Sequence, residues 1–256
     1  MLEKRLIPCL LLSDGVLVKT QQYKKPSYIG DAVNTVRIFN ELEVDELVFL
    51  DIDASKKGQV PQYELLAEIA SECFMPLAYG GGVRTIEMAR KIFKIGFEKI
   101  IINHELIENK SFIKELVQAF GSQSIIGAVD IKKGWFSVNK VYSHVKKKTL
   151  DLDPILYIKQ LESYGVGELL ITMVEKEGMF RGLDIPLLDE ISKMMRIPVI
   201  GHGGVGTLDD ICQGFALTGL SAIAVGSFVV YQNENRSVLI NYPTQVERTW
   251  NLDLCL

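Results

Sequence analysis

The sequence predicts an α/β protein built as a single (β/α)8 barrel, or TIM barrel, from two similar half-barrels. Its length of 256 residues is typical of such a barrel. Eight short apolar runs alternate with segments of helical period, the order that gives a parallel sheet with helices outside it. Two glycine-rich phrases, Pro76–Thr85 (PLAYGGGVRT) and Pro198–Thr207 (PVIGHGGVGT), start 122 residues apart, near half of the length.

The expected strands are continuous apolar runs, because parallel strands are covered on both faces. They fall at about 5–11, 46–51, 75–79, 98–103, 124–130, 168–173, 198–201 and 221–226. Helices are expected between them at 29–42, 63–73, 85–95, 110–120, 154–164 and 187–195, among others. Neither a linker nor a shift in composition marks a second domain. We therefore expect one domain over residues 1–256, with half-barrels at about 1–122 and 123–240.

The glycine clusters and two long loops indicate where ligands bind. Glycines between a strand and a helix let backbone N–H groups approach a phosphate, so two clusters suggest a ligand with a phosphate at each end. The segments 13–29 and 132–150 follow strands one and five, and loops after the strands form the catalytic face of such barrels. The second loop contains Trp135, Tyr142, His144 and the run Lys146–Lys148, which we expect to be solvated.

Composition narrows the function classes. A net charge of −4 argues against a general nucleic-acid surface. We find no signal peptide, and no apolar run approaches the ~20 residues of a membrane span. The cysteines show no C-x-x-C spacing, which favours core packing and a reducing cytoplasm; they are Cys9, Cys73, Cys212 and Cys255. The three histidines lack the spacing of a helical zinc motif, so we expect neither a metal nor a redox cofactor.

Carboxylates at strand ends are the candidates for acid–base chemistry. Asp130 ends an apolar strand at the expected catalytic face, where aliphatic walls would raise its pKa. The alternative is a structural aspartate that caps the next loop. Asp51 and Asp53 end strand two, and either could cap the segment that follows.

Four charged residues lie where strands begin. If side chains of this parity point inward, Arg5, Glu46, Lys99 and Glu168 ring the floor of the barrel. Such groups are costly to bury unless they pair. The ring is either a salt-bridged plug or a gate through which a small polar molecule enters, and the residues alone leave both open.

The chain resembles the cyclase subunit family of imidazole glycerol phosphate synthase over nearly its whole length. The resemblance rests on several segments in register, namely MLEKRLIPCL at the start, Asp45–Asp51, Tyr79–Arg84, Phe120–Ser124 and Gly167–Thr172. It implies a (β/α)8 barrel that takes ammonia from a class I glutamine amidotransferase docked at its N-terminal face. Ammonia would pass the charged floor and reach a bisphosphorylated ribulosyl substrate.

The resemblance also implies roles for individual residues. Arg5, Glu46, Lys99 and Glu168 match the family's ammonia gate, and Lys19 its mobile-loop lysine. One phosphate site would be formed by Gly81, Gly82 and Asn103, and the other by Gly203, Gly204, Gly226 and Ser227.

The departures from the family concern the catalytic end. The family has two catalytic aspartates, and here one is Asp130 while Leu11 stands at the other position. A leucine can neither take nor give a proton. The loop Glu175–Met179 replaces Asp-Arg-Asp-Gly-Thr, and Lys176 lacks the bidentate fork of arginine. The expected further ligand contacts are His104, Thr172, Glu177, Gly178 and His202, the two histidines being equally compatible with structural roles.

This combination is similar to a branch of the family associated with acetamidino modification of surface-polysaccharide sugars. There the barrel and its glutaminase supply ammonia to a separate ATP-dependent sugar amidotransferase. One alternative is a true cyclase of histidine biosynthesis in which Asp51, Asp53 or His202 replaces the missing acid. Another is a non-catalytic protein that senses a sugar phosphate and activates the glutaminase.

Overall fold

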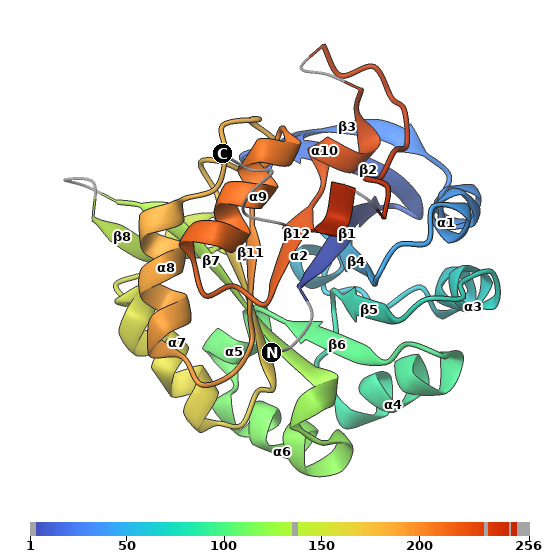
Figure 1. Cartoon of the computed structure of the whole chain (residues 1–256). Helices are drawn as coiled ribbons and strands as arrows, with labels where there is room; N and C mark the ends of the chain where they lie inside the picture. Colours follow the sequence, from blue (N-terminus) through green and yellow to red (C-terminus); the bar gives the residue numbers. More distant parts are fainter. Residues whose placement is uncertain (1–3, 135–137, 233–234, 246, 250–256) are drawn as a thin grey trace.

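The structure, a computed structural model, describes residues 4–134, 138–232, 235–245 and 247–249. Its centre is a closed barrel of eight parallel strands, each paired with the next and β7 with β10 (Figure 1). In barrel order the strands are β1 (Arg5–Ser13), β4 (Leu47–Asp51), β5 (Leu77–Gly80), β6 (Lys99–Ile102), β7 (Ile125–Lys133), β10 (Glu168–Met173), β11 (Val199–His202) and β12 (Ala222–Val225). The predicted (β/α)8 fold is confirmed, while the internal repeat stays a prediction.

Helices cover the outside of the barrel (Figure 1). The long ones are α1 (Ala32–Glu41), α3 (Tyr63–Ser71), α4 (Ile86–Ile95), α6 (Lys110–Phe120), α7 (Pro154–Ser163), α8 (Ile185–Met194) and α9 (Leu208–Leu217). Short helical turns follow β4, β6 and β12, namely α2 (Ala54–Lys57), α5 (His104–Glu108) and α10 (Ser227–Val230). The described residues also include the 3₁₀ turns η1 (Ser122–Ser124) and η3 (Glu247–Thr249).

Capping residues determine the first residue of two helices whose starts hydrophobic periodicity misplaced. The helix expected from residue 29 begins at Ala32, because the Asp31 side chain accepts a hydrogen bond from the Asn34 N–H at 2.8 Å. The helix expected from residue 187 begins at Ile185, since Asp184 caps it in the same way. Hydrophobic period locates a helix, but the cap decides its first residue.

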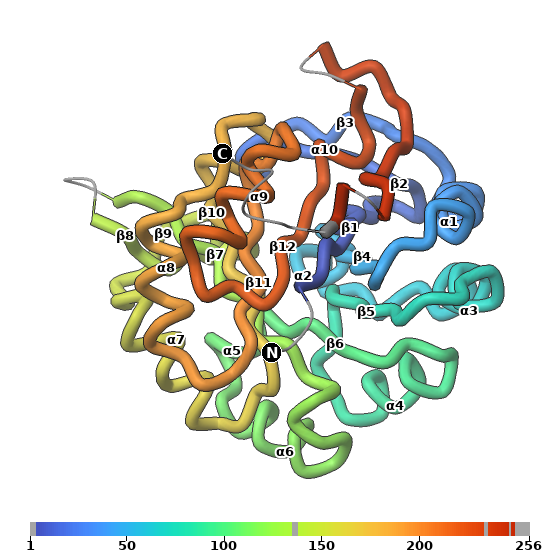
Figure 2. Tube along the Cα trace, in the orientation of Figure 1, coloured from blue at the N-terminus to red at the C-terminus, as the bar shows by residue number. Residues whose placement is uncertain are grey.

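Both segments expected to be loops are β-hairpins. Residues 13–29 form β2 (Val16–Gln21), which pairs antiparallel with the end of β1, and most of β3 (Lys24–Gly30), which pairs antiparallel with β2. The second segment forms β8 (Asn139–Ser143) and β9 (Lys148–Thr149), while Trp135 lies outside the described residues. Figure 2 shows the β2–β3 hairpin beside α10 and, further around the barrel, β8 beside β7. We call the β2–β3 hairpin the lid hairpin.

The core has two layers because successive strand residues point to opposite faces. The outer layer fills the space between sheet and helices with large side chains such as Leu6, Phe39 and Phe49. The barrel interior holds a separate, smaller set: Ile7, Cys9, Val48, Ala78, Ile101, Ile126, Ala128, Leu170, Ile200, Ala222 and Ala224. Its alanines limit how much of the interior side chains fill.

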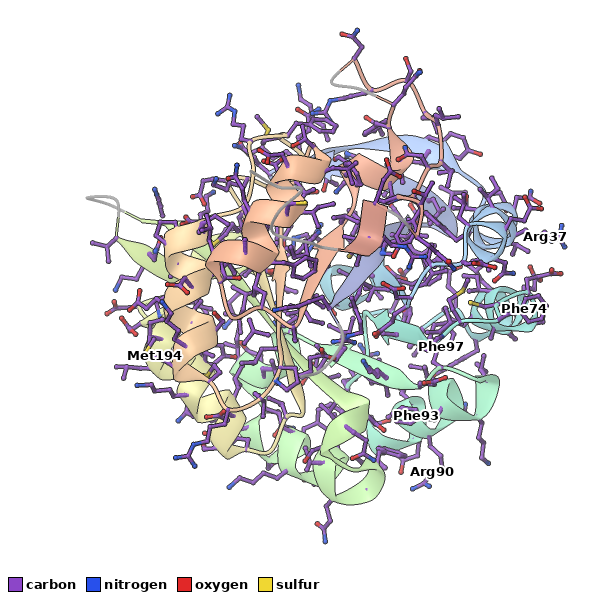
Figure 3. All side chains as sticks on the ribbon, viewed as in Figure 1. Arg37, Phe74, Arg90, Phe93, Phe97 and Met194 are labelled. Carbon is purple, nitrogen blue, oxygen red and sulfur yellow. The ribbon has the colours of Figure 1, made fainter. Side chains whose placement is uncertain are left out.

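Aromatic side chains stabilise the outer layer around α4. Phe97 packs edge-on against Tyr79 with ring centroids 5.9 Å apart, and Phe93 packs on Phe120 at 4.7 Å. Figure 3 shows Phe97, Phe93 and Arg90 on this side of the molecule and Phe74 at its edge near α3. The Phe74 side chain is 90% exposed, in contrast to these packed rings.

The cysteines correct one expectation. Cys9 and Cys73 are free, but Cys212 is disulfide-bonded, so the prediction of scattered thiols is wrong at this position. Cysteine spacing along the chain does not reveal which thiols the fold brings within bonding distance; Cys255 lies outside the described residues. Among the described helices, none has the length and apolar content to cross a bilayer.

Candidate functional site

Four charged residues close the N-terminal end of the barrel. Arg5, Lys99 and Glu168 are the first residues of β1, β6 and β10, and Glu46 directly precedes β4. The Arg5 guanidinium donates to Glu46 Oε2 at 2.6 Å and also pairs with Glu168. Lys99 Nζ lies 3.0 Å from Glu46 Oε1 and 3.1 Å from Glu168 Oε2. We call these four residues the floor ring.

The floor ring separates the barrel interior from an open cavity. Glu46 and Glu168 are only 3% and 6% exposed, and each carboxylate contacts both cations, which offsets the cost of its burial. Outside the ring lies a cavity of about 1170 Å³ that Arg5, Lys99 and Glu168 line together with Lys4 and Asp45. The structure therefore brings the four predicted residues together, in the inward orientation that strand parity indicated.

A second cavity, of about 850 Å³ including its solvent-filled mouth, lies at the other end of the barrel. We call it the rim cavity. It gathers candidate residues from the ends of β1, β4, β5, β6, β7, β10 and β11 and the loop after β10; these are Leu11, Asp51, Gly81, Asn103, Asp130, Thr172, His202 and Glu177. Leu11 is 5% exposed and places an apolar side chain in this wall.

Asp130 is the buried carboxylate of the rim cavity. The hydroxyl of Tyr23 donates to its Oδ1 at 2.6 Å, and Asn103 Nδ2 donates to its Oδ2 at 3.1 Å. Burial raises the pKa of Asp130 to about 6, against the effect of these two hydrogen bonds, which favour the ionised form. A carboxyl with a pKa in this range can exchange protons with a ligand near neutral pH.

An ion pair holds the lid hairpin over the rim cavity. Lys19, on β2, pairs with Glu177, and the two side chains are 4% and 1% exposed. Glu177 Oε2 also accepts hydrogen bonds from Thr20 Oγ1 at 3.0 Å and the Tyr23 N–H at 3.2 Å. Burial acts to raise the pKa of Glu177, but Lys19 and the Tyr23 N–H outweigh it and hold that pKa below its usual value. Glu177, predicted to contact the ligand, thus engages the lid with both oxygens.

The second glycine cluster forms a small cradle beside Lys19. Gly203 and Gly204 have φ angles of 100° and 110°, which favour glycine, and a Cβ on Gly226 would lie 2.7 Å from Lys19 Cε. A cavity of about 220 Å³ is lined by Lys19, Gly178, His202, Gly203, Gly204, Gly226 and Ser227, among others. Within the described residues, the buried Ser227 hydroxyl has no hydrogen-bond partner, so it remains available to a ligand.

The first glycine cluster is less open. Gly81 has a φ of 133° and lines the rim cavity, but the N–H of Gly82 donates to Ser55 Oγ at 3.1 Å. Asn103, which the resemblance placed at this phosphate site, donates to Ala128 O and to Asp130. Of the three residues expected here, two therefore already have protein partners.

Asp51 serves the local backbone. Its Oδ1 accepts hydrogen bonds from the N–H groups of Asp53 and Ala54, both at 2.9 Å, so it caps the turn after β4. Burial raises the pKa of Asp51, although these N–H donors oppose the shift. Asp53 instead bonds Ser13 at 2.6 Å and pairs with Lys57.

The two histidines that differ from the family pattern, His202 and His104, occupy different environments. His202 is 4% exposed, and its Nδ1 lies 3.1 Å from Thr172 Oγ1. Burial, followed by the charge of Lys19, lowers the pKa of His202 to about 4, so its imidazole is neutral at neutral pH. His104 opens α5 outside the residues that line the rim cavity, and its buried Nδ1 has no partner within the described residues.

Sequence reasoning missed the residues that complete the lid. Tyr23, Thr20 and His144 all line the rim cavity, yet they lie in segments expected to be loops. The Tyr23 ring meets His144 edge-on at 5.3 Å and Tyr142 at 6.2 Å, which joins the two hairpins. The sequence carries little signal for this hairpin, because its strands, VLVKTQ and KKPSYIG, do not alternate apolar and polar residues and Gln22 and Tyr23 are not usual turn residues.

The fold and the site together define a closed (β/α)8 barrel with a charged floor and two glycine clusters at its rim. Residues 5–235 match the model of a family described as histidine biosynthesis protein, and the chain belongs to this family.

Named relatives cover nearly the whole chain. A Pseudomonas aeruginosa protein with the provisional name imidazole glycerol phosphate synthase subunit hisF2 is 45% identical over 243 residues, or 95% of this chain and 97% of that protein. A Vibrio vulnificus protein provisionally named subunit hisF3 is 39% identical over 99% of this chain and 98% of its own length. A Hydrogenobaculum protein named imidazole glycerol phosphate synthase subunit HisF is 38% identical over 89% of this chain and 90% of its own length.

Proposed function

We propose that this chain is the ammonia-receiving barrel of a glutamine-dependent complex of the imidazole glycerol phosphate synthase type, and that it supplies ammonia for amidino-sugar synthesis. One observation carries the proposal: the floor ring is complete, whereas Leu11 lines the rim cavity where the resembling family has a catalytic aspartate. The entrance is retained, and half of the acid–base pair needed for ring closure is lost.

The interior between the two ends suits neutral ammonia. The side chains between the floor ring and the rim cavity are apolar and include several alanines. An apolar passage disfavours a charged ammonium ion far more than neutral ammonia. Two carboxylates and two cations that already satisfy one another leave no net charge to trap the molecule at the entrance.

The partner at the N-terminal face is a class I glutamine amidotransferase. The cavity outside the floor ring supports this assignment, because a docked glutaminase could release ammonia directly against Arg5 and Lys99. The exposed Phe74, which precedes β5 at its N-terminal end, offers an apolar contact on the same face.

At the rim, a phosphorylated small molecule occupies the glycine cradles. The cradle formed by Gly203, Gly204, Gly226 and the unpartnered Ser227 hydroxyl supports this ligand class. Release of ammonia at the rim would then serve a separate ATP-dependent sugar amidotransferase, which converts an acetamido group to an amidine.

Growth of a histidine auxotroph that lacks its cyclase tests the proposal. We expect no growth when this chain is expressed with its glutaminase. Glutaminase stimulation should persist in the purified pair, because the floor ring is unchanged. Robust growth would falsify the ammonia-supply function and establish a cyclase.

Two alternative functions are a cyclase and a non-catalytic activator of the glutaminase. A cyclase is favoured by one observation, that Asp51 and His202 line the same cavity as Asp130. Ammonia-dependent turnover of the ribulosyl substrate by purified protein would demonstrate it. A non-catalytic activator predicts that Asp130→Asn retains full glutaminase stimulation and full pathway output, whereas the proposed function predicts a loss of pathway output only.

A further inference from the structure

Tyr23 lies in the turn of the lid hairpin and has an unusual backbone conformation. Gln22 and Tyr23 form the turn of the lid hairpin with φ angles of 52° and 62°, which residues with side chains seldom adopt. Contacts with the loop after β10 hold the turn: the Gln22 N–H donates to Glu177 O at 2.9 Å, and Gln22 Nε2 donates to Glu175 O at 2.9 Å. The turn is therefore fixed by tertiary contacts that point Tyr23 into the rim cavity.

The Tyr23 hydroxyl stays protonated and donates to Asp130. Burial, followed by the charge of Asp130, raises the pKa of Tyr23 well above its usual value, so the hydroxyl keeps its proton. The bond to Asp130 Oδ1 is short, at 2.6 Å, as expected when a hydroxyl donates to a carboxylate. Asn103 supplies the second donor, to Oδ2.

The apolar part of the cavity wall gives this bond its importance. Leu11, Leu50, Ala128 and Leu170 line the rim cavity and cannot donate a hydrogen bond through their side chains. A carboxylate facing such a wall protonates readily unless donors stabilise its charge.

We propose that Tyr23 is a positioning residue for Asp130: from the closed lid, its hydroxyl keeps this carboxylate ionised and oriented to accept a hydrogen bond from an N–H or O–H group of the ligand. The inference rests on the proposed function and adds to it, because Asp130 is the one carboxylate retained here of the two catalytic aspartates in the family.

Other titratable groups face Asp130 from each neighbouring element, and they stay unchanged in the test below. They are Asp51 on β4, Tyr142 and His144 around β8, Tyr157 on α7, Glu177 after β10 and His202 on β11. The charge of Glu177 acts in the opposite sense to Tyr23, since it raises the pKa of Asp130.

The test measures the pKa of Asp130 by NMR titration of carboxyl-labelled aspartate, with Asp130→Asn to assign the signal. Tyr23→Phe keeps the ring and removes the hydroxyl, so we expect the pKa of Asp130 to rise by about one unit. Tyr142→Phe is the matched control, because that ring packs on Tyr23 without a hydrogen bond to Asp130; it should leave the pKa unchanged.

A second experiment tests whether opening of the lid, rather than loss of the hydroxyl, causes the pKa change in the phenylalanine variant. Incorporation of 3,5-difluorotyrosine at position 23 makes the phenol a stronger donor without removing any contact, so the pKa of Asp130 should fall. An Asp130 pKa that does not move, or moves the other way, in the fluorinated protein overturns the inference. The measurement needs no ammonia acceptor, so this failure leaves the proposed function standing, and growth of the auxotroph overturns only the latter.

Discussion

The two ends of the barrel treat buried charge in different ways. At the floor, two cations and two carboxylates bind one another in a closed ring of side chains at the starts of the strands. At the rim, Lys19 and Glu177 pair through a hairpin, while Asp130 has only neutral donors. The floor is thus electrostatically self-sufficient, whereas the rim holds a carboxylate whose protonation depends on the lid.

Removing one cation from the floor should have the largest effect. Arg5→Met leaves Glu46 and Glu168 to share Lys99, and an uncompensated buried carboxylate costs roughly 3–4 kcal/mol. We expect this loss in the free energy of unfolding measured with urea. Arg5→Lys, the matched control, keeps the charge and should lose clearly less; equal losses would show that packing rather than charge is responsible.

At the rim, the corresponding variant should open the lid before it unfolds the barrel. Lys19→Met leaves the buried Glu177 unpaired, which costs on the order of 2–3 kcal/mol, but water can reach that carboxylate once the hairpin lifts. Amide exchange should accelerate in β2 and β3 while β4 and β5 stay protected. Lys24→Met, on the same hairpin but exposed, is the control. Uniform acceleration across the barrel would contradict the contrast between the ends.

Asp130 should reduce stability at neutral pH. Its folded pKa of about 6 exceeds the reference of 3.8, so the cost of burying the ionised form appears as pH rises through 3.8 and is complete above about 6. Asp130→Asn should therefore stabilise the protein by about 3 kcal/mol at pH 7 and not at pH 3. Thermal unfolding across this range measures the difference; a gain of equal size at both pH values would rule out the titration of Asp130 as its cause.

The smallest expected effect concerns the lost partner carboxylate. Leu11→Asp adds a second acid to the rim cavity, and like charge should raise the pKa of Asp130 by about one unit. The readout is the same carboxyl titration, with Leu11→Asn as the uncharged control. If Leu11 alone blocks cyclisation in this chain, the variant should also show a trace of that activity. No change in the pKa of Asp130 would mean that the two positions do not interact.

Much of the barrel follows from pattern alone. Continuous apolar runs placed all eight strands to within a few residues, because a strand covered on both faces needs apolar side chains throughout. The floor ring followed from strand parity, since residues that open adjacent parallel strands must meet at one end.

The rim was predicted less completely. The sequence indicated Asp130, Lys19 and the glycine clusters, but it could not show that Glu177 binds the lid or that Asp51 caps a turn. It also missed Tyr23, whose contact with Asp130 spans 107 residues of chain. Such contacts depend on how two loops fold over the barrel, and loops lack the periodic signal of strands and helices.

The sequence by itself determined the barrel, the four charged residues of the floor ring and the leucine at position 11. Only the tertiary structure decided which side chains at the rim form hydrogen bonds or ion pairs with one another and which line the same cavity. The physical reason is separation along the chain. Burial patterns repeat every two or four residues and can be recognised locally. The pKa of Asp130 and the neutrality of His202 are instead set by groups that only the folded lid and barrel bring close together.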